Sequence, residues 1–292
     1  MTASNGIAIP IDSIFHPTDL SEASFVAFVH ALKIALLAQS ELTILHAANS
    51  GGDKVSWKDF PGVRQTLERW GELPKGSSTR AISELGMTVE KIAGRGPKPV
   101  KTVTSYLQAN PAQLVVLSSE GREGIPRFLK PSFAEPVARK TRAMTLFVPS
   151  HASGFVDGDT GRVTLDRILL PFNHKPRSRP AINLARAFVR ALDDDGGVFD
   201  LLHVGERGKA PAVDIPDEIG WTSEKHYESG DVVDAILRVA EEKGAELIVM
   251  TTTGRDDRTG RARGELPGSH DPGGLSGLRP RRPRAVDGTS IW

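Results

Sequence analysis

The chain reads IDSIFHPTDL at residues 11–20 and LDRILLPFNH at residues 165–174, and this internal repeat decides its fold. Each stretch is a short apolar run that ends in a proline and a polar residue. Each precedes a segment whose apolar side chains recur at helical spacing. In the first copy these side chains include Phe28 and Leu32, behind a predicted N-cap at Ser21. The repeat predicts two tandem units, each beginning with a strand and a helix.

Two further pairs of apolar runs continue the repeat. LTILHA at 42–47 corresponds to FDLLHV at 199–204, and QLVVLSS at 113–119 corresponds to ELIVMTT at 246–252. These runs lack a polar alternation, which is typical of strands buried on both faces of a parallel sheet. Strands that alternate with helical patterns predict an α/β fold, with a doubly wound parallel sheet in each of two tandem domains.

The second copy is shorter between its second and fourth strands. The first copy has a predicted helix around residues 56–70 in this region. The second copy has GERGKAPAVDIPDEIGWT at 205–222, where Gly and Pro exclude a comparable helix.

These patterns divide the chain into four parts. Residues 1–149 form the first domain, and 150–164 are small and polar and are predicted to be a linker. Residues 165–255 form the second domain, which is truncated or degenerate at its carboxyl end. Residues 256–292 are dominated by Gly, Pro and Arg and are expected to lack a stable fold. The tail is either a degenerate or frame-shifted end or a basic arm, RPRRPR at 279–284, for nucleic acid or an acidic partner.

Composition narrows the function classes. The formal net charge of +1 argues against attraction of the whole molecule to nucleic acid or anionic lipid. The absence of cysteine excludes disulfides, thiolate metal sites and a cysteine nucleophile. No apolar run approaches the ~20 residues that span a bilayer, and residues 1–10 lack the basic start of a signal peptide. We therefore expect a cytoplasmic protein with no membrane partner.

The sequence resembles the universal stress protein family over almost all of 11–149 and about 166–255. The segments that carry the resemblance lie at 15–24, 42–47, 114–149, 167–173, 200–205 and 230–255. It implies a tandem member of the family with two domains of the adenine nucleotide alpha hydrolase-like type. It also implies a stress-response or regulatory role, with ATP and Mg²⁺ held at the carboxyl ends of the central strands.

The resemblance places a candidate nucleotide site in the first copy. Pro17, Thr18 and Asp19 follow the first strand, where the family's aspartate receives the adenine, and Ala47 falls at the position that lines the adenine pocket. The family wraps the phosphates with G-x-x-G, then nine residues and Gly-Ser or Gly-Thr. Glycine lets the backbone approach a phosphate, and a helix N-terminus supplies donors.

The phosphate loop of the first copy matches this pattern in part. Ser118 stands at the first glycine position, and Gly121 is retained. Pro131 replaces the last glycine and removes one N–H donor, whereas Ser132 keeps the hydroxyl. Arg122 supplies a positive charge that compensates for the missing glycines.

The second copy departs further from the family pattern. Asn173 takes the aspartate position, and Val204 falls at the adenine-pocket position. Thr251 replaces the first glycine and Gly254 is retained. Glu265 stands where the hydroxyl belongs, and a carboxylate there repels a triphosphate.

The sequence offers no catalytic or metal-binding constellation. It has no Ser/His/Asp array, no HExxH and no intact P-loop. His46 and His203 occupy equivalent strand ends, which we interpret as a feature of the repeated scaffold. His16 lies near Asp19 and is a candidate neighbour of the pocket.

Three function classes remain open. The first is a regulatory stress protein that binds an adenine nucleotide and hydrolyses it slowly at most. The second is a ligand-free interaction module that forms a homo-oligomer or pseudo-dimer through its sheet edges, because a missing fifth strand leaves an edge unpaired. The third is a nucleotide-hydrolysing or adenylate-forming enzyme on a related fold. None of the three requires nucleic acid as a partner.

Overall fold

The computed structural model describes residues 9–49, 55–96, 98–119, 133–141, 143–149, 154–192, 196–216, 218, 220–252 and 289–291. The strands of the first repeat are β1 (Ser13–Thr18), β2 (Glu41–Asn49), β3 (Thr88–Gly96), β4 (Leu114–Ser119) and β5 (Met144–Pro149). Its helices are α1 (Glu22–Ala38), α2 (Val63–Arg69), α3 (Ala81–Glu84), α4 (Pro99–Ala109) and α5 (Ala134–Thr141).

The second repeat has fewer elements. Its strands are β6 (Arg167–Pro171), β7 (Gly197–Val204), β8 (Trp221–Glu228) and β9 (Leu247–Thr251). Its helices are α6 (Arg179–Ala191), the short 3₁₀ helix η2 (Arg207–Lys209) and α7 (Val232–Lys243). A last strand, β10, spans Thr289–Ile291.

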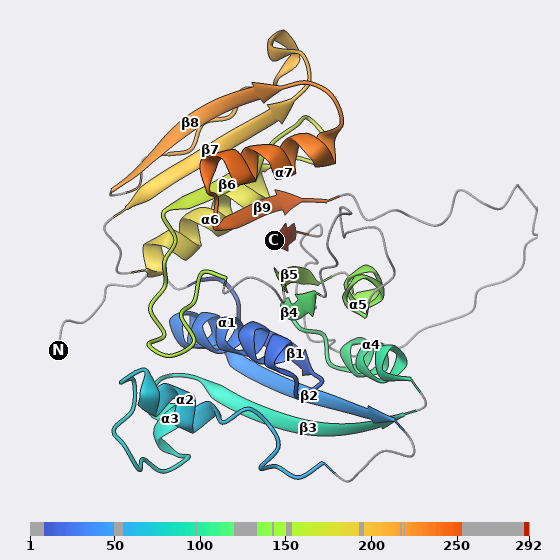
Figure 1. Cartoon of the computed structure of the whole chain (residues 1–292), viewed down its shortest axis with the longest axis vertical. Helices are drawn as coiled ribbons and strands as arrows, with labels where there is room; N and C mark the ends of the chain where they lie inside the picture. Colours follow the sequence, from blue (N-terminus) through green and yellow to red (C-terminus); the bar gives the residue numbers. More distant parts are fainter. Residues whose placement is uncertain are drawn as a thin grey trace, which may run out of the picture.

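The strand order confirms the predicted fold class of two parallel-sheet α/β units in tandem. The first repeat has the order β3-β2-β1-β4-β5, and the second has β8-β7-β6-β9, which is the same order without its fifth strand (Figure 1). All neighbouring strands within each repeat are parallel. The helices that connect them lie on both faces of the sheet (Figure 1), as right-handed crossovers require.

The strand β10 occupies the place of the missing fifth strand but runs in the wrong direction for it. It lies between β5 and β9, parallel to β5 and antiparallel to β9. A fifth strand of the repeat would run parallel to β9, as β5 runs parallel to β4. We expected an unpaired edge at this place and a tail without structure, yet these three residues pair on both sides. The edges of the described sheet are therefore β3 and β8.

One hydrophobic core joins the two repeats. It contains side chains of α1, such as Phe28 and Leu32, together with side chains of α6, such as Leu184 and Phe188. The helix α1 is apolar and buried around most of its surface, because core residues from both repeats surround it. Two smaller hydrophobic clusters lie apart from this core. One is covered by α4 and α5, and the other is covered by α7.

The segment predicted to be the linker contributes to this core in its described part. Phe155 and Val156 are only 3% and 1% exposed, and Val156 forms a β-bridge with Val163. The ring of Phe155 lies 5.6 Å from that of Phe188 in α6. Residues 154–164 therefore hold the two repeats together.

A glycine in this segment is required by its neighbours. Gly161 has φ +70°, and a Cβ there would lie 2.5 Å from the Trp70 ring, whose Nε1 donates to the Gly158 carbonyl (3.1 Å). We expect Gly161→Ala to lower the free energy of unfolding by about 2 kcal/mol, through left-handed strain and overpacking. Urea titration measures this loss. Gly158→Ala is the control, because no atom lies within 4 Å of its added methyl group; equal losses in both variants would contradict the prediction.

The shortened region of the second repeat lacks helices equivalent to α2 and α3 within its described residues. The helix predicted around 56–70 is found as α2, which begins at Val63. Residues 205–216 contain only η2. Among the described residues, no helix combines the length and the apolar character needed to cross a membrane.

Candidate functional site

The carboxyl ends of β1, β2 and β4 meet at one edge of the first sheet, because these strands are parallel neighbours. The register places Thr18 beside His46, one residue before Ala47. It also pairs Phe15 with Val115, so Thr18 and Ser118 lie at the same height three residues later. The structure thus places four of the predicted residues at the same edge of the first sheet: Thr18, Asp19, Ala47 and Ser118.

The turn between β1 and α1 presents the Asp19 carboxylate to solvent. The Thr18 hydroxyl oxygen accepts hydrogen bonds from the Leu20 N–H (3.0 Å) and from Ser24 Oγ (2.9 Å). Asp19 Oδ1 accepts from the N–H (3.0 Å) and Oγ (2.6 Å) of Ser21, which is the N-cap that the sequence predicts. Asp19 is exposed, and its Oδ2 accepts no hydrogen bond from any described residue. One carboxylate oxygen fixes the turn, and the other has no hydrogen-bond partner among the described residues.

Two predicted residues flank this turn without offering polar side chains. Pro17 is buried and fixes the backbone just before Thr18. Ala47 is half-buried and packs against the core cluster under α4.

The paired histidines serve the scaffold. The Nδ1 atom of His46 lies 2.9 Å from the Thr18 carbonyl, and that of His203 lies 3.3 Å from the Phe172 carbonyl. Both rings therefore donate to the carbonyl oxygen at the end of the first strand of their repeat. This agrees with our interpretation from the sequence.

His16 does not border the pocket. It is fully buried, and its Nδ1 donates to the Val116 carbonyl (3.0 Å) while its ring lies near Phe28 of α1 (6.3 Å between ring centroids). Burial lowers its pKa to about 4, against smaller opposing effects of the Val116 hydrogen bond and the Asp19 charge. His16 is therefore a neutral core residue under α1.

The phosphate half of the candidate site is outside the described residues. Gly121, Arg122, Pro131 and Ser132 all fall between residues 120 and 132. Gly254 of the second repeat also falls outside, as do residues 256–288 of the tail. The roles of these residues remain predictions from the resemblance.

In the second repeat, a longer loop crosses the equivalent strand ends. The loop connects Pro171 to the α6 N-cap Ser178, and it contains the exposed Asn173, whose Oδ1 accepts the His174 N–H (2.7 Å). Thr251 Oγ1 at the end of β9 donates to the Arg177 carbonyl (2.8 Å).

On its other side, this loop contacts the segment after β7. His174 Nε2 lies 3.0 Å from the Lys209 carbonyl of η2. Val204, which is half-buried, is the last residue of β7. The loop is thus bonded to the end of β9 and to η2, so it bridges the strand ends of the second repeat. The extra residues between Pro171 and Ser178 were the sequence signal for this bridging loop.

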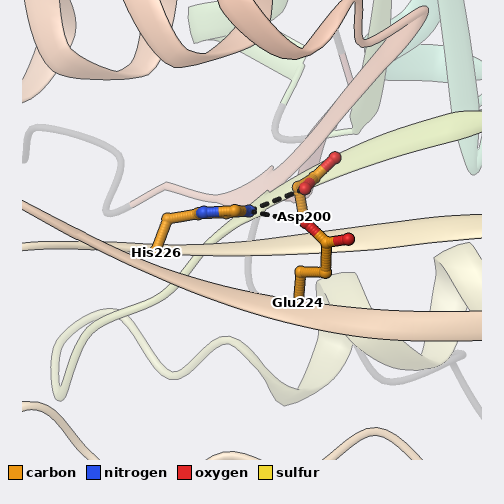
Figure 2. Close-up of side chains that lie close together, drawn as sticks. All are labelled: Asp200, Glu224 and His226. Carbon is orange, nitrogen blue, oxygen red and sulfur yellow. Dashed lines mark hydrogen bonds and ion pairs between the residues drawn. The ribbon is translucent and has the colours of Figure 1, made fainter.

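A second polar cluster, on β7 and β8, consists of Asp200, Glu224 and His226 (Figure 2). Their candidate ligand atoms lie within 4.8 Å of one another, which is close enough for a metal ion. However, the Arg167 guanidinium already donates to both oxygens of Asp200 (2.9 and 3.0 Å) and lies 3.5 Å from Glu224. His226 Nε2 is 2.7 Å from Asp200, and Lys243 is 3.6 Å from Glu224.

The charges of this cluster are balanced within the protein. Burial raises the pKa of Asp200, but hydrogen bonds from Arg167 and His226 outweigh it and hold that pKa below its ordinary value. The guanidinium occupies the position that a cation would take. We therefore assign the cluster a structural role.

Comparison with known proteins bears on both repeats. A sequence model described as the universal stress protein family matches residues 10–149 and 217–267. No curated protein matches the chain.

Among solved structures, a universal stress protein from Archaeoglobus fulgidus DSM 4304 is 19% identical, with a TM-score of 0.51, over 84% of this chain and 86% of that one. A putative universal stress protein from Pseudomonas aeruginosa UCBPP-PA14 is 14% identical, with a TM-score of 0.52, over 86% of each chain. At these identities the likeness concerns the tandem fold.

Proposed function

Because the chain belongs to the universal stress protein family, we propose that it is a cytoplasmic stress-response regulator whose first repeat binds ATP with Mg²⁺. The observation that carries the proposal is the exposed Asp19 carboxylate at the strand ends, held by Ser21 through one oxygen and without a partner among the described residues at the other. A fixed acceptor beside the small side chain of Ala47 suits the amino edge and the flat ring of adenine.

The remaining roles in this proposal follow the sequence pattern. Thr18 and Pro17 hold the backbone on which Asp19 stands. Ser118, Gly121 and Ser132 contact the phosphates, and Arg122 adds a compensating charge. Mg²⁺ neutralises part of the triphosphate charge when the nucleotide binds.

The same geometry supports one nucleotide per chain. The loop that carries Asn173 bonds across its strand ends to Thr251 and to η2. The two-residue connection from Thr18 to Ser21 in the first repeat makes no such crossing among the described residues. Binding would therefore make the two halves of the molecule different, which suits a regulatory signal.

Calorimetric titration of the full chain with ATP and Mg²⁺ tests the proposal. We expect one equivalent bound per chain. Asp19→Asn keeps an oxygen for Ser21 but replaces the open acceptor, so it should weaken binding about 10- to 100-fold, the usual worth of a hydrogen bond to a charged group. The matched variant Asn173→Ala should bind like the wild type.

Two results would count against this function. The first is no heat and no rise in melting temperature at millimolar ATP, since a ligand of the native state must stabilise it. The second is equal binding by Asp19→Asn and the wild type, which would move the nucleotide away from this turn.

A further inference from the structure

A cavity of about 570 Å³ lies between β3 and the helices α2 and α3, away from the Asp19 turn. Its size falls in the range of small-molecule sites. Its apolar lining consists of Val63, Ile82, Met87 and Val89. Trp57, 62% exposed, lies at its edge and packs on Phe60 (5.6 Å between ring centroids).

Two basic side chains line the same cavity. Lys91 is half-buried, and its Nζ donates to the Pro61 carbonyl (2.9 Å). No carboxylate of the described residues lies within ion-pair distance of it. Arg64 donates from Nη1 to the Ser77 carbonyl (3.1 Å), and its buried Nε makes no hydrogen bond to the described residues, with Glu68 Oε1 at 3.5 Å. A half-buried ammonium group without a counter-charge among the described residues favours an anion beside it.

The second repeat has a lysine at the same position of its sheet. Lys91 pairs with Ile44 in the sheet register, and Lys225 pairs with Leu201; these two partners precede His46 and His203 by two residues. Lys225 is exposed, and its Nζ lies 3.1 Å from Asp214. Its charge is therefore paired with a carboxylate of the same repeat at the surface. The unpaired lysine and the α2–α3 segment occur together only in the first repeat, within the described residues.

We propose that this cavity binds a small amphipathic anion, with one acidic head group on Lys91 and Arg64 and an apolar body against Ile82, Met87 and Val89. The head group accepts a charge-assisted hydrogen bond from the Lys91 ammonium. The apolar walls exclude ligands that are charged along their whole length. Binding here is independent of the nucleotide proposed at Asp19.

Fluorescence titration of the full chain with 8-anilinonaphthalene-1-sulfonate, an aromatic dye with one acidic group, tests the proposal. We expect saturable binding that Lys91→Met weakens about tenfold, the loss of one such ion pair, and that Lys91→Arg retains. Lys225→Met is the matched control and should leave the dye affinity unchanged. Decanoate and decyl phosphate should displace the dye, whereas decyltrimethylammonium and 1-decanol should not.

Other outcomes overturn the site. Equal dye binding by wild type, Lys91→Met and Lys225→Met means that no specific cation is involved. Displacement by 1-decanol as effective as by decanoate means that the cavity is only an apolar pocket. Ile82→Trp fills the cavity without changing its charge, so we expect it to abolish dye binding. Unchanged dye binding by this variant would also overturn the site. Asp19→Asn and saturating ATP with Mg²⁺ should leave dye binding intact, so failure of the nucleotide proposal and failure of this one are distinguishable.

Discussion

Replacing His30 by Phe is expected to lower the free energy of unfolding by about 3 kcal/mol at neutral pH. His30 in α1 is 1% exposed, and its Nε2 accepts the backbone N–H groups of Phe155 (3.1 Å) and Val156 (3.2 Å). Its Nδ1 donates to the Val26 carbonyl (2.8 Å). Phe keeps the ring that packs edge-on against Phe155 but leaves both N–H groups buried without an acceptor, at about 1–3 kcal/mol each.

The same contact predicts an acid sensitivity. Burial lowers the pKa of His30 from 6.5 to about 4, against a smaller opposing effect of its hydrogen bond to the Val26 carbonyl. Between about pH 4 and pH 6.5, the unfolded chain therefore binds a proton at His30 that the folded chain does not bind. The contribution of His30 to stability is complete above pH 6.5 and is lost as pH falls toward 4, by at most about 1.4 kcal/mol per pH unit. The His30→Phe variant should show a shallower fall over this window.

Calorimetry and urea titration at pH 7.5 and pH 5 measure both effects. Because His30 ties α1 to residues 154–164, and Phe155 contacts Phe188 of the second repeat, the variant should also unfold in two separated transitions. His174→Phe is the control, since His174 is exposed and its ring bonds a single carbonyl. If His30→Phe had the same unfolding midpoint and the same pH dependence of stability as the wild type, His30 would not join α1 to residues 154–164 in this way.

The sequence predicted the elements of the fold but not what joins them. The buried runs and helical spacings indicated the helices and the first, second and fourth strands of both repeats, because these elements carry continuous or periodic apolar patterns. His30 and Phe155 are 125 residues apart, and a lone histidine in a helix carries no sign of its partner. The three residues of β10 lack any periodic pattern, so neither their pairing nor their reversed direction was predictable.

The candidate site, like the fold, could be predicted from the sequence only in part. Asp19 and its N-cap partner Ser21 were predictable, because their hydrogen bonds are local and the short segment from Asp19 to Ser21 carries the signal for both residues. The bridging loop of the second repeat depends on the bond between Thr251 and Arg177, which are 74 residues apart. The charge of Lys91 was not singled out, because only the fold shows that its equivalent Lys225 has a carboxylate partner and that Lys91 has none among the described residues.

The second large effect is expected at Arg167, where Arg167→Met should cost about 3–5 kcal/mol at pH 7. Asp200 on β7 has no exposed surface, and Arg167 satisfies both of its oxygens. Removing the guanidinium leaves a buried carboxylate with His226, at 2.7 Å, as its remaining side-chain donor among the described residues. A buried charge without its partner destabilises the fold by this amount. Chemical denaturation of the single variant measures the loss.

The pH dependence and a double variant separate charge from packing. In the wild type the lowered pKa of Asp200 stabilises the fold above its ordinary value of 3.8. Without Arg167, burial raises that pKa instead, so the variant should regain stability relative to the wild type as pH falls toward 4.

Asp200→Asn in the same chain removes the unpaired charge and should recover most of the loss at pH 7. Arg238→Met, on an exposed pair with Glu228, should leave the midpoint nearly unchanged. A loss in Arg167→Met that is independent of pH and is not recovered by adding Asp200→Asn would mean that the aliphatic packing of Arg167, and not the charge of Asp200, stabilises this face of the sheet.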